Sequence, residues 1–141
     1  NITFPLMLKG KKGYDFSYSG LKTAVINYVH TNEMAKREFS KADVANCFQS
    51  NAINALIKNT LKAVNECGVN TITVGGGVGA NGYLRENLKK ECCKRGIKLV
   101  LPEKVYCTDN AAMIGAEGYL QYLNRNFANL ELNAKASVKL D

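Results

Sequence analysis

The chain has 141 residues, a net charge of +7 and five cysteines. This length suits one domain with a hydrophobic core rather than two, and no apolar run reaches the roughly 18 residues that a membrane-spanning helix needs. No signal peptide opens the chain, and an odd set of cysteines without a C-x-x-C pair argues against a disulfide framework and a zinc knuckle; we therefore expect a reduced, cytoplasmic protein with no membrane partner.

The basic excess and the first residue suggest two further expectations. The surplus of 19 Lys and Arg over 12 Asp and Glu favours a polyanionic partner such as RNA, and it equally favours a surface that is merely well solvated. The chain starts at Asn1 and its first methionine is Met7, which indicates a processed chain or a piece of a longer protein. A catalytic site is then expected to be only partly present.

The first predicted element is a strand. Aromatic and polar side chains alternate over residues 14–19, and this period of two is typical of strands. Residues 21–30 show helical spacing, and the polar residues 31–39 are expected to form a loop. Ser17 and Ser19 are either hydrogen-bonding strand residues or contacts to a polar ligand. No histidine stands near them in the sequence to suggest a pair of nucleophile and base, so the structural role is favoured.

A long helix comes next. Ser40 and Asp43 form the capping signature S-x-x-D ahead of an apolar run. The helix is expected to end near Cys67, where Gly68 supplies a stop signal. Its apolar stripe is wide, which predicts burial against more than one neighbour.

The second half of the chain predicts a β-α-β unit followed by a helix. Strands are expected at 71–74 and 98–102 on either side of a helix over 81–95, and they should be parallel with a right-handed crossover. A last helix is expected over 110–124, and residues 128–141 form a terminal extension. The order of elements predicts an α/β protein, and about three strands are few for a free-standing sheet, which again indicates part of a larger protein.

The turn between the first of these parallel strands and its helix reads VGGGVGANGYL. Gly77, Gly79 and Gly82 literally fit G-x-G-x-x-G, but the acidic residue that should end the next strand of a dinucleotide-binding fold is displaced to Glu103. Glycines ahead of a helix N-terminus also suit a phosphate or a ribose. A nucleotide site and a simple tight turn both remain open on this stretch alone.

Asp109, in YCTDNAAMIGAEGY, is a second candidate. It stands where the last helix should begin, so it is either an N-terminal cap or a metal ligand at the carboxyl end of a strand. Taken alone, the cap is favoured, because one carboxylate cannot hold a metal. The only histidine, His30, is expected to end another helix. A metal site would therefore need residues outside this chain.

Three segments in order, DFSYSGLKTAV, VGGGVGANGYLRENL and YCTDNAAMIGAEGY, resemble a known family. Its pattern is similar to F-S-F-S-G-L-K-T, then G-G-V-x-A-N-x-x-L-R, then C-T-D-N-A-A-M-I. The family that these segments resemble is that of the catalytic subunit of tRNA threonylcarbamoyladenosine synthase. It is the TsaD/Gcp family, formerly called O-sialoglycoprotein endopeptidase or glycoprotease. The resemblance covers residues 4–124 and matches the C-terminal half of the family. It implies an RNase H-like lobe of the actin/Hsp70/sugar-kinase (ASKHA) type over 1–127, with 128–141 as an extension.

The resemblance implies an adenylate site and one metal ligand. Gly75, Gly76 and Gly77 match the turn that receives the adenosine side of the nucleotide, and Asn81 matches the asparagine that contacts the adenylate. Asp109 matches the family's aspartate ligand of a catalytic iron or zinc ion. The remaining ligands would be a histidine pair on an N-terminal lobe, and nothing in the chain supports the older protease label.

Some residues near the glycine turn depart from the family pattern or lie outside the implied site. Gly79 stands where Ala or Ser is usual, and Gly82 follows the asparagine, so both are expected to loosen the start of the helix. On that helix, four basic side chains are expected to remain largely solvated: Arg85, Lys89, Lys94 and Arg95.

The function that the resemblance implies is the transfer of a threonylcarbamoyl group from threonylcarbamoyl-adenylate to the adenosine next to the anticodon, in tRNAs that read codons beginning with A. The implied partners are tRNA, a paralogous subunit, an ATPase subunit and the N-terminal lobe of the same protein. The chain alone is expected to be inactive. A non-catalytic partner-binding module of the same superfamily would be expected to lose Asn81 and Asp109, which are both present. A dinucleotide-dependent oxidoreductase is disfavoured by the misplaced acid.

Overall fold

The computed structural model describes residues 2–4 and 13–134. The chain divides into two compact units, Asn1–Cys107 and Thr108–Asp141. Part of the predicted terminal extension, residues 135–141, lies outside the described residues. Among the helices of the described part, none is both long enough and apolar enough to cross a membrane.

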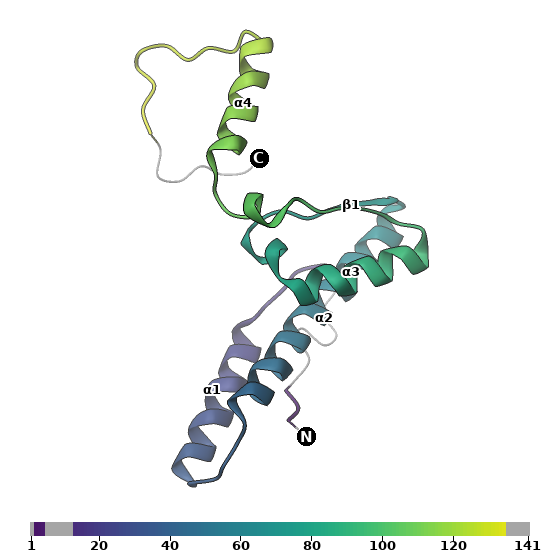
Figure 1. Cartoon of the computed structure of the whole chain (residues 1–141), viewed down its shortest axis with the longest axis vertical. Helices are drawn as coiled ribbons and strands as arrows, with labels where there is room; N and C mark the ends of the chain where they lie inside the picture. Colours follow the sequence, from purple (N-terminus) through teal and green to yellow (C-terminus); the bar gives the residue numbers. More distant parts are fainter. Residues whose placement is uncertain (1, 5–12, 135–141) are drawn as a thin grey trace. The chain divides into compact units, whose positions relative to one another are not determined.

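Two helices of the first unit, α1 (Ser19–Met34) and α2 (Lys41–Cys67), run side by side in opposite directions (Figure 1). α1 continues past His30, so part of the loop predicted over 31–39 is helical. The sequence has no glycine or proline in that range to stop the helix earlier. A small apolar cluster lies between the two helices and consists of Phe4, Leu21, Val44 and Ala52.

The ends of α2 confirm the local sequence signals. Ser40 is the N-terminal cap, and its Oγ accepts a hydrogen bond from the Asp43 backbone N–H at 3.1 Å. Gly68 ends the helix with a φ of 64°, in the left-handed region that glycine adopts without steric cost.

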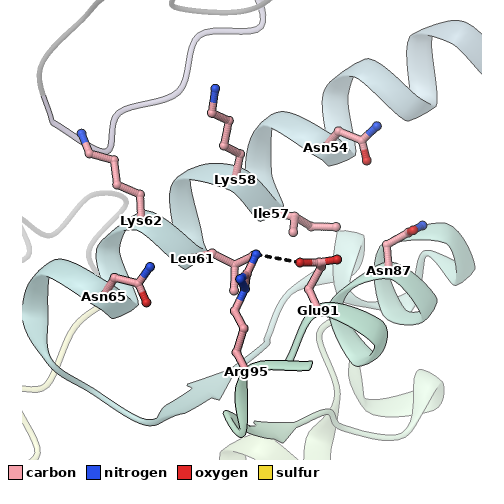
Figure 2. A pocket seen from close by; sticks show the side chains of 9 residues that line it. All are labelled: Asn54, Ile57, Lys58, Leu61, Lys62, Asn65, Asn87, Glu91 and Arg95. Atoms are coloured by element: carbon pink, nitrogen blue, oxygen red, sulfur yellow. Dashed lines mark hydrogen bonds and ion pairs between the residues drawn. The ribbon is translucent and has the colours of Figure 1, made fainter. Parts of the chain in front are cut away.

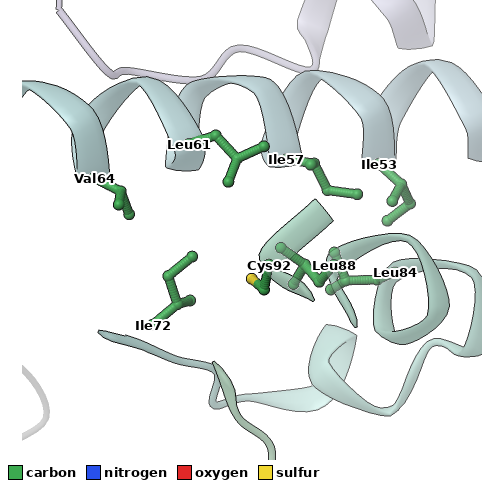
Figure 3. Close-up of a cluster of buried hydrophobic side chains, with 8 residues drawn as sticks. All are labelled: Ile53, Ile57, Leu61, Val64, Ile72, Leu84, Leu88 and Cys92. Carbon is green, nitrogen blue, oxygen red and sulfur yellow. The ribbon is translucent and has the colours of Figure 1, made fainter. Parts of the chain in front are cut away.

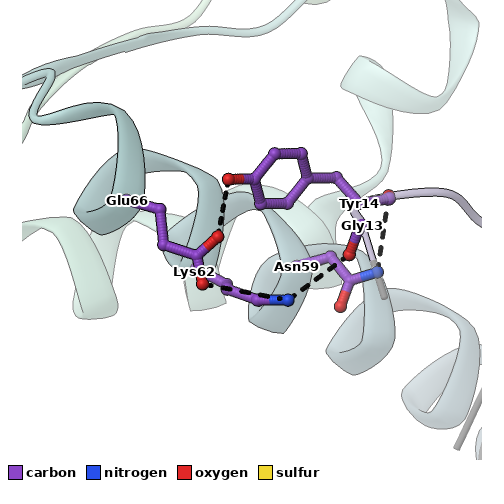
Figure 4. A network of polar contacts seen from close by, with 5 residues as sticks. All are labelled: Gly13, Tyr14, Asn59, Lys62 and Glu66. Atoms are coloured by element: carbon purple, nitrogen blue, oxygen red, sulfur yellow. Dashed lines mark hydrogen bonds and ion pairs between the residues drawn. The ribbon is translucent and has the colours of Figure 1, made fainter. Parts of the chain in front are cut away.

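The strand predicted over residues 14–19 does not form. The side chain of Asn59 on α2 donates to the carbonyl oxygens of Tyr14 and Asp15, both at 3.4 Å, and the Tyr14 hydroxyl donates to Glu66 at 2.6 Å (Figure 4). Backbone polar groups need a partner, and side chains of a helix meet that need here. The alternation of aromatic residues was therefore a wrong indicator of a strand.

The two serines of this segment are accordingly not strand residues. Ser17 is half-buried in irregular backbone, and Ser19 is the first residue of α1. The Ser19 carbonyl accepts a hydrogen bond from the Thr23 hydroxyl at 3.0 Å, as expected within a first helical turn.

The predicted β-α-β unit is confirmed. It consists of β1 (Thr71–Thr73), α3 (Gly82–Arg95) and β2 (Lys98–Val100), and the two strands pair in parallel with Ile72 opposite Leu99. The Val74 backbone N–H extends the pairing by donating to the Val100 carbonyl at 3.1 Å. These are the two strands of the described residues, so the fold is α/β with a small parallel sheet.

The main core of the first unit lies between α2, α3 and β1 (Figure 3). Its α2 residues recur every three or four positions and therefore share one helix face, and burying each such side chain contributes about 1.5–3 kcal/mol. This core fixes β1 and α3 against α2 and so positions the turn that joins them. Its members are Ile53, Ile57, Leu61, Val64, Ile72, Leu84, Leu88 and Cys92.

The second unit contains helix α4 (Ala111–Leu123), close to the predicted range 110–124. The Tyr122 ring, in the last turn of this helix, meets the Phe127 ring edge to face, with centroids 6.1 Å apart. None of the α4 residues is buried.

Candidate functional site

The glycine turn begins where β1 ends. Gly75 and Gly76 are exposed, and a short 3-10 helix, η1 (Gly77–Ala80), follows. Gly76 has φ 79° and ψ 167°, a backbone conformation that only glycine adopts without strain. The Gly79 N–H donates to the Gly76 carbonyl at 2.8 Å and closes the turn. The predicted strand-to-helix turn is therefore present, with its exposed glycines at the carboxyl end of a parallel strand.

Gly79 is buried inside this turn. A Cβ atom at this position would lie 3.2 Å from Val74 Cγ1 and 3.6 Å from Cys107 Sγ. The first distance is closer than ordinary van der Waals contact, so the turn packs tightly where the resemblance leads one to expect Ala or Ser. Gly82, in contrast, has open space around it and is the first residue of α3.

Asn81 is the N-terminal cap of α3 and is half-buried. Its Oδ1 accepts from the Leu84 N–H at 2.9 Å, and its Nδ2 donates to Gln49 Oε1 at 3.1 Å. Because a carboxamide has two N–H donors and two lone pairs, one of each remains for a ligand. Gln49 belongs to α2, and sequence reasoning did not single it out because it lies far from Asn81 in the chain.

Arg85 is not largely solvated, as the sequence led us to expect; it is half-buried against the turn. Its guanidinium donates to the Gly79 carbonyl at 2.8 Å and to the Pro102 carbonyl at 2.7 Å. Arg85 follows Asn81 by about one helical turn, which places both on the same side of α3. That spacing was the signal in the sequence that could have located it.

Asp109 lies in the second unit, whereas the glycines and Asn81 lie in the first. Its carboxylate is exposed, and the N-terminal cap of α4 is Asn110, whose Oδ1 accepts from the Met113 N–H at 3.1 Å. The prediction that Asp109 caps the helix is therefore wrong, because α4 begins at Ala111 and the residue just before it has the extended backbone of a cap.

The donor set for a metal ion is incomplete in the described part of the chain. The Asp109 carboxylate is a suitable oxygen ligand for iron or zinc. No group of three His, Cys, Asp or Glu side chains among the described residues could hold a metal ion. Asp109 fits the role of one ligand, and the others would have to come from elsewhere.

An open groove is lined by residues of both α2 and α3, on a different part of the first unit (Figure 2). Its cationic side chains are Lys58, Lys62 and Arg95, and Arg95 forms an ion pair with Glu91 at 2.8 Å. A hydrogen bond from Lys94 lowers the pKa of Glu91 below its ordinary value. The lining includes neither the glycines nor Asn81, so the groove is separate from the predicted adenylate site.

Comparison with known proteins connects these features to one family. Residues 1–116 match the family model described as TsaD, tRNA N6-adenosine threonylcarbamoyltransferase. Curated relatives with that name include proteins from Clostridium botulinum strain Kyoto, 44% identical over 99% of this chain, and Clostridium perfringens strain SM101, 42% identical over 99% of it. A relative from Clostridium kluyveri, strain ATCC 8527, is 44% identical over 92% of this chain.

The relatives are much longer than this chain. The alignment covers 41% of the two proteins from C. botulinum and C. perfringens and 38% of the one from C. kluyveri, so this chain spans about 40% of the length of its relatives. The agreement of the family model over most of the chain, together with these identities, shows that the chain belongs to the TsaD family of tRNA N6-adenosine threonylcarbamoyltransferases.

Proposed function

We propose that the chain is the C-terminal lobe of a transferase that moves a threonylcarbamoyl group from threonylcarbamoyl-adenylate to the adenosine next to the anticodon, in tRNAs that read codons beginning with A. The observation that carries the proposal is the exposed glycine turn at the end of β1, followed directly by Asn81 at the start of α3. This arrangement lies within the part of the chain that matches the family model.

The turn is the binding site for the adenylate in this proposal. Gly75, Gly76 and Gly77 leave the main chain accessible, and the N-terminus of α3 adds partial positive charge that suits a phosphate or a ribose. Asn81 contributes the amide hydrogen and the lone pair that its bonds to Leu84 and Gln49 leave over. Holding the adenylate in a fixed orientation toward the attacking amine is itself a large part of catalysis.

Asp109 is one ligand of a catalytic iron or zinc ion in this proposal, and a histidine pair on the N-terminal lobe supplies the others. When bound, such an ion provides Lewis-acid polarisation of the threonylcarbamoyl-adenylate. Asp109 contributes an exposed carboxylate that does not serve as the cap of α4 and is therefore available for coordination.

The remaining parts of the proposal concern the setting of the reaction. We infer an RNase H-like lobe of the ASKHA type, of which β1, α3 and β2 are one portion, in a cytoplasmic protein. The partners are tRNA, a paralogous subunit and an ATPase subunit, and the net charge of +7 is compatible with tRNA binding. Retention of Asn81 and Asp109 favours a catalytic subunit over a partner-binding module, and family membership favours it over an oxidoreductase.

The experiment that tests the proposal uses the full-length protein that contains this chain, its partner subunits, tRNA, threonine, bicarbonate and ATP. Threonylcarbamoyladenosine is quantified by mass spectrometry after digestion of the tRNA. Wild type should form product, and Asp109→Ala should form at least about 100-fold less, since loss of metal-site groups has effects of this order.

The matched control is Glu117→Gln, which alters another exposed carboxylate in the second unit while keeping an acceptor for Gln121. This variant should retain wild-type activity. Equal product from wild type and a folded Asp109→Ala protein would remove Asp109 from the metal site. No product from wild type with all partners present would refute the proposed transferase.

A further inference from the structure

Arg85 joins three segments of the first unit through its guanidinium group. Nη1 donates to the Gly79 carbonyl at 2.8 Å and Nη2 donates to the Pro102 carbonyl at 2.7 Å. Nη1 also donates to Cys107 Sγ at 3.9 Å, a long contact to a buried sulfur. Gly79 belongs to the glycine turn that follows β1 and Pro102 lies just after β2, so one side chain bridges the loops at the carboxyl ends of both strands.

The chemistry of these contacts requires an arginine. The guanidinium is a planar fork with several donors in fixed directions, whereas the lysine ammonium is a single compact donor that serves one carbonyl well. Hydrogen bonds from a charged donor are roughly twice as strong as those between neutral groups. Arg85 is half-buried, so competition from water for these two carbonyls is reduced.

The hydrogen bonds that Arg85 donates to oxygen both go to main-chain carbonyl groups. Two of its donors are used by the Gly79 and Pro102 carbonyls. The Gly79 backbone N–H in turn donates a hydrogen bond to the Gly76 carbonyl at 2.8 Å, and the Asn81 backbone N–H donates one to the Val78 carbonyl at 3.0 Å. Holding the Gly79 carbonyl therefore holds the whole segment from Gly76 to Asn81 in one conformation.

We propose that Arg85 is a positioning residue that fixes the glycine turn against the end of β2 in the conformation that receives an adenylate. The inference rests on the proposed function, because the adenylate is the ligand for which the turn is positioned. It assigns to this site a residue that does not itself contact the nucleotide.

The first test needs no ligand and follows backbone hydrogen exchange in the full-length protein. Wild type, Arg85→Lys and Arg85→Met are compared with Lys89→Met, which alters an exposed cation one turn further along α3. Exchange in peptides covering 75–81 should be about tenfold faster in Arg85→Met, the size expected for losing a charged hydrogen bond. Arg85→Lys should be intermediate, and Lys89→Met and the peptides of α2 should be unchanged. Unaltered exchange over 75–81 would overturn the inference.

The second test measures AMP binding to the same four proteins by calorimetry. The dissociation constant should rise about tenfold in Arg85→Met, less in Arg85→Lys and not at all in Lys89→Met. Faster exchange with unchanged AMP affinity would make Arg85 a purely structural residue and overturn its positioning role. Failure of the wild type to bind AMP would instead refute the proposed adenylate site itself, so the two failures give different results.

Discussion

At the scale of single residues, the candidate site depends on backbone conformations and side-chain bonds that few substitutions can preserve. Gly76 has φ 79° with ψ 167°. The side chain of Asn81 makes two hydrogen bonds, accepting one from the Leu84 N–H and donating the other to Gln49 Oε1. Each of these two residues therefore has a structural role as well as its proposed contact with the adenylate, and suitable substitutions distinguish the two roles.

Gly76→Ala should destabilise the protein because a Cβ atom is strained at this φ and ψ, at a cost of about 1–3 kcal/mol. Gly75→Ala is the matched control, since Gly75 has no positive φ and a Cβ atom added there would meet no other atom within 4 Å. Urea unfolding of both variants measures the difference. Equal stability of the two would mean that the turn relaxes to another conformation.

Asn81→Asp and Asn81→Ala should differ in stability, whereas both should bind adenylate less tightly than wild type. Aspartate is a good N-terminal cap, so Asn81→Asp should keep the capping contribution that Asn81→Ala loses, about 1 kcal/mol. Both changes remove the amide donor, so both should weaken AMP binding. Thermal unfolding and calorimetry measure the two effects, and wild-type AMP affinity in Asn81→Asp would restrict Asn81 to its capping role.

At the scale of elements, α2 organises the first unit. One side of it supplies the core that holds β1 and α3, and its polar side chains hold the segment that precedes α1. Lys62 joins this polar network: its Nζ lies 3.8 Å from Glu66 and 5.5 Å from the centre of the Tyr14 ring (Figure 4). The network predicts a pH effect at Tyr14.

The pKa of Tyr14 is raised from 10.0 to about 12, mainly by the hydrogen bond to Glu66 and to a smaller extent by desolvation and the negative charge of Glu66. Because the folded-state pKa is the higher one, the contribution of this bond is complete below pH 10 and disappears as the pH rises through 12. Ultraviolet titration should show a phenolate transition near pH 12 that Tyr14→Phe removes. Glu66→Gln should move that transition back toward pH 10. A Tyr14 transition that stays near pH 12 in this variant would show that Glu66 does not raise the pKa of Tyr14.

At the scale of the whole molecule, the chain is only part of what its relatives contain. It spans 41% of the protein from C. botulinum, and its sequence has one histidine, His30, which lies within α1 in the first unit. A metal site that combined Asp109 with a histidine pair would therefore need at least one histidine from outside this chain. The proposed reaction then depends on parts of the protein that this chain does not supply.

The isolated chain should consequently form no threonylcarbamoyladenosine, even with partner subunits, tRNA and the small-molecule substrates present. The informative comparison is a chimera in which this chain replaces the matching part of the C. botulinum relative, which is 44% identical to it. The chimera should form product and the chain alone should not. Turnover by the chain alone would contradict a site shared with other parts of the protein.

Several features of the fold and the site follow from the sequence by itself. The cap at Ser40, the stop at Gly68, the β-α-β unit and the glycine turn were all predictable, and so was the position of Asn81 at the start of α3. These features depend on contacts between residues a few positions apart or on the period of the apolar pattern, which are directly visible in a sequence.

Other features were decided only by the tertiary structure. The backbone polar groups of the alternating segment 14–19 could bond to a neighbouring strand or to side chains of a helix. In the structure, the side chain of Asn59 on α2 donates hydrogen bonds to two carbonyl oxygens of this segment. Gln49 meets Asn81, and Arg85 meets Pro102, across long stretches of chain. The physical reason is the same in each case: a polar group accepts whichever partner the packing of distant elements brings within hydrogen-bond distance, and local sequence does not specify that partner.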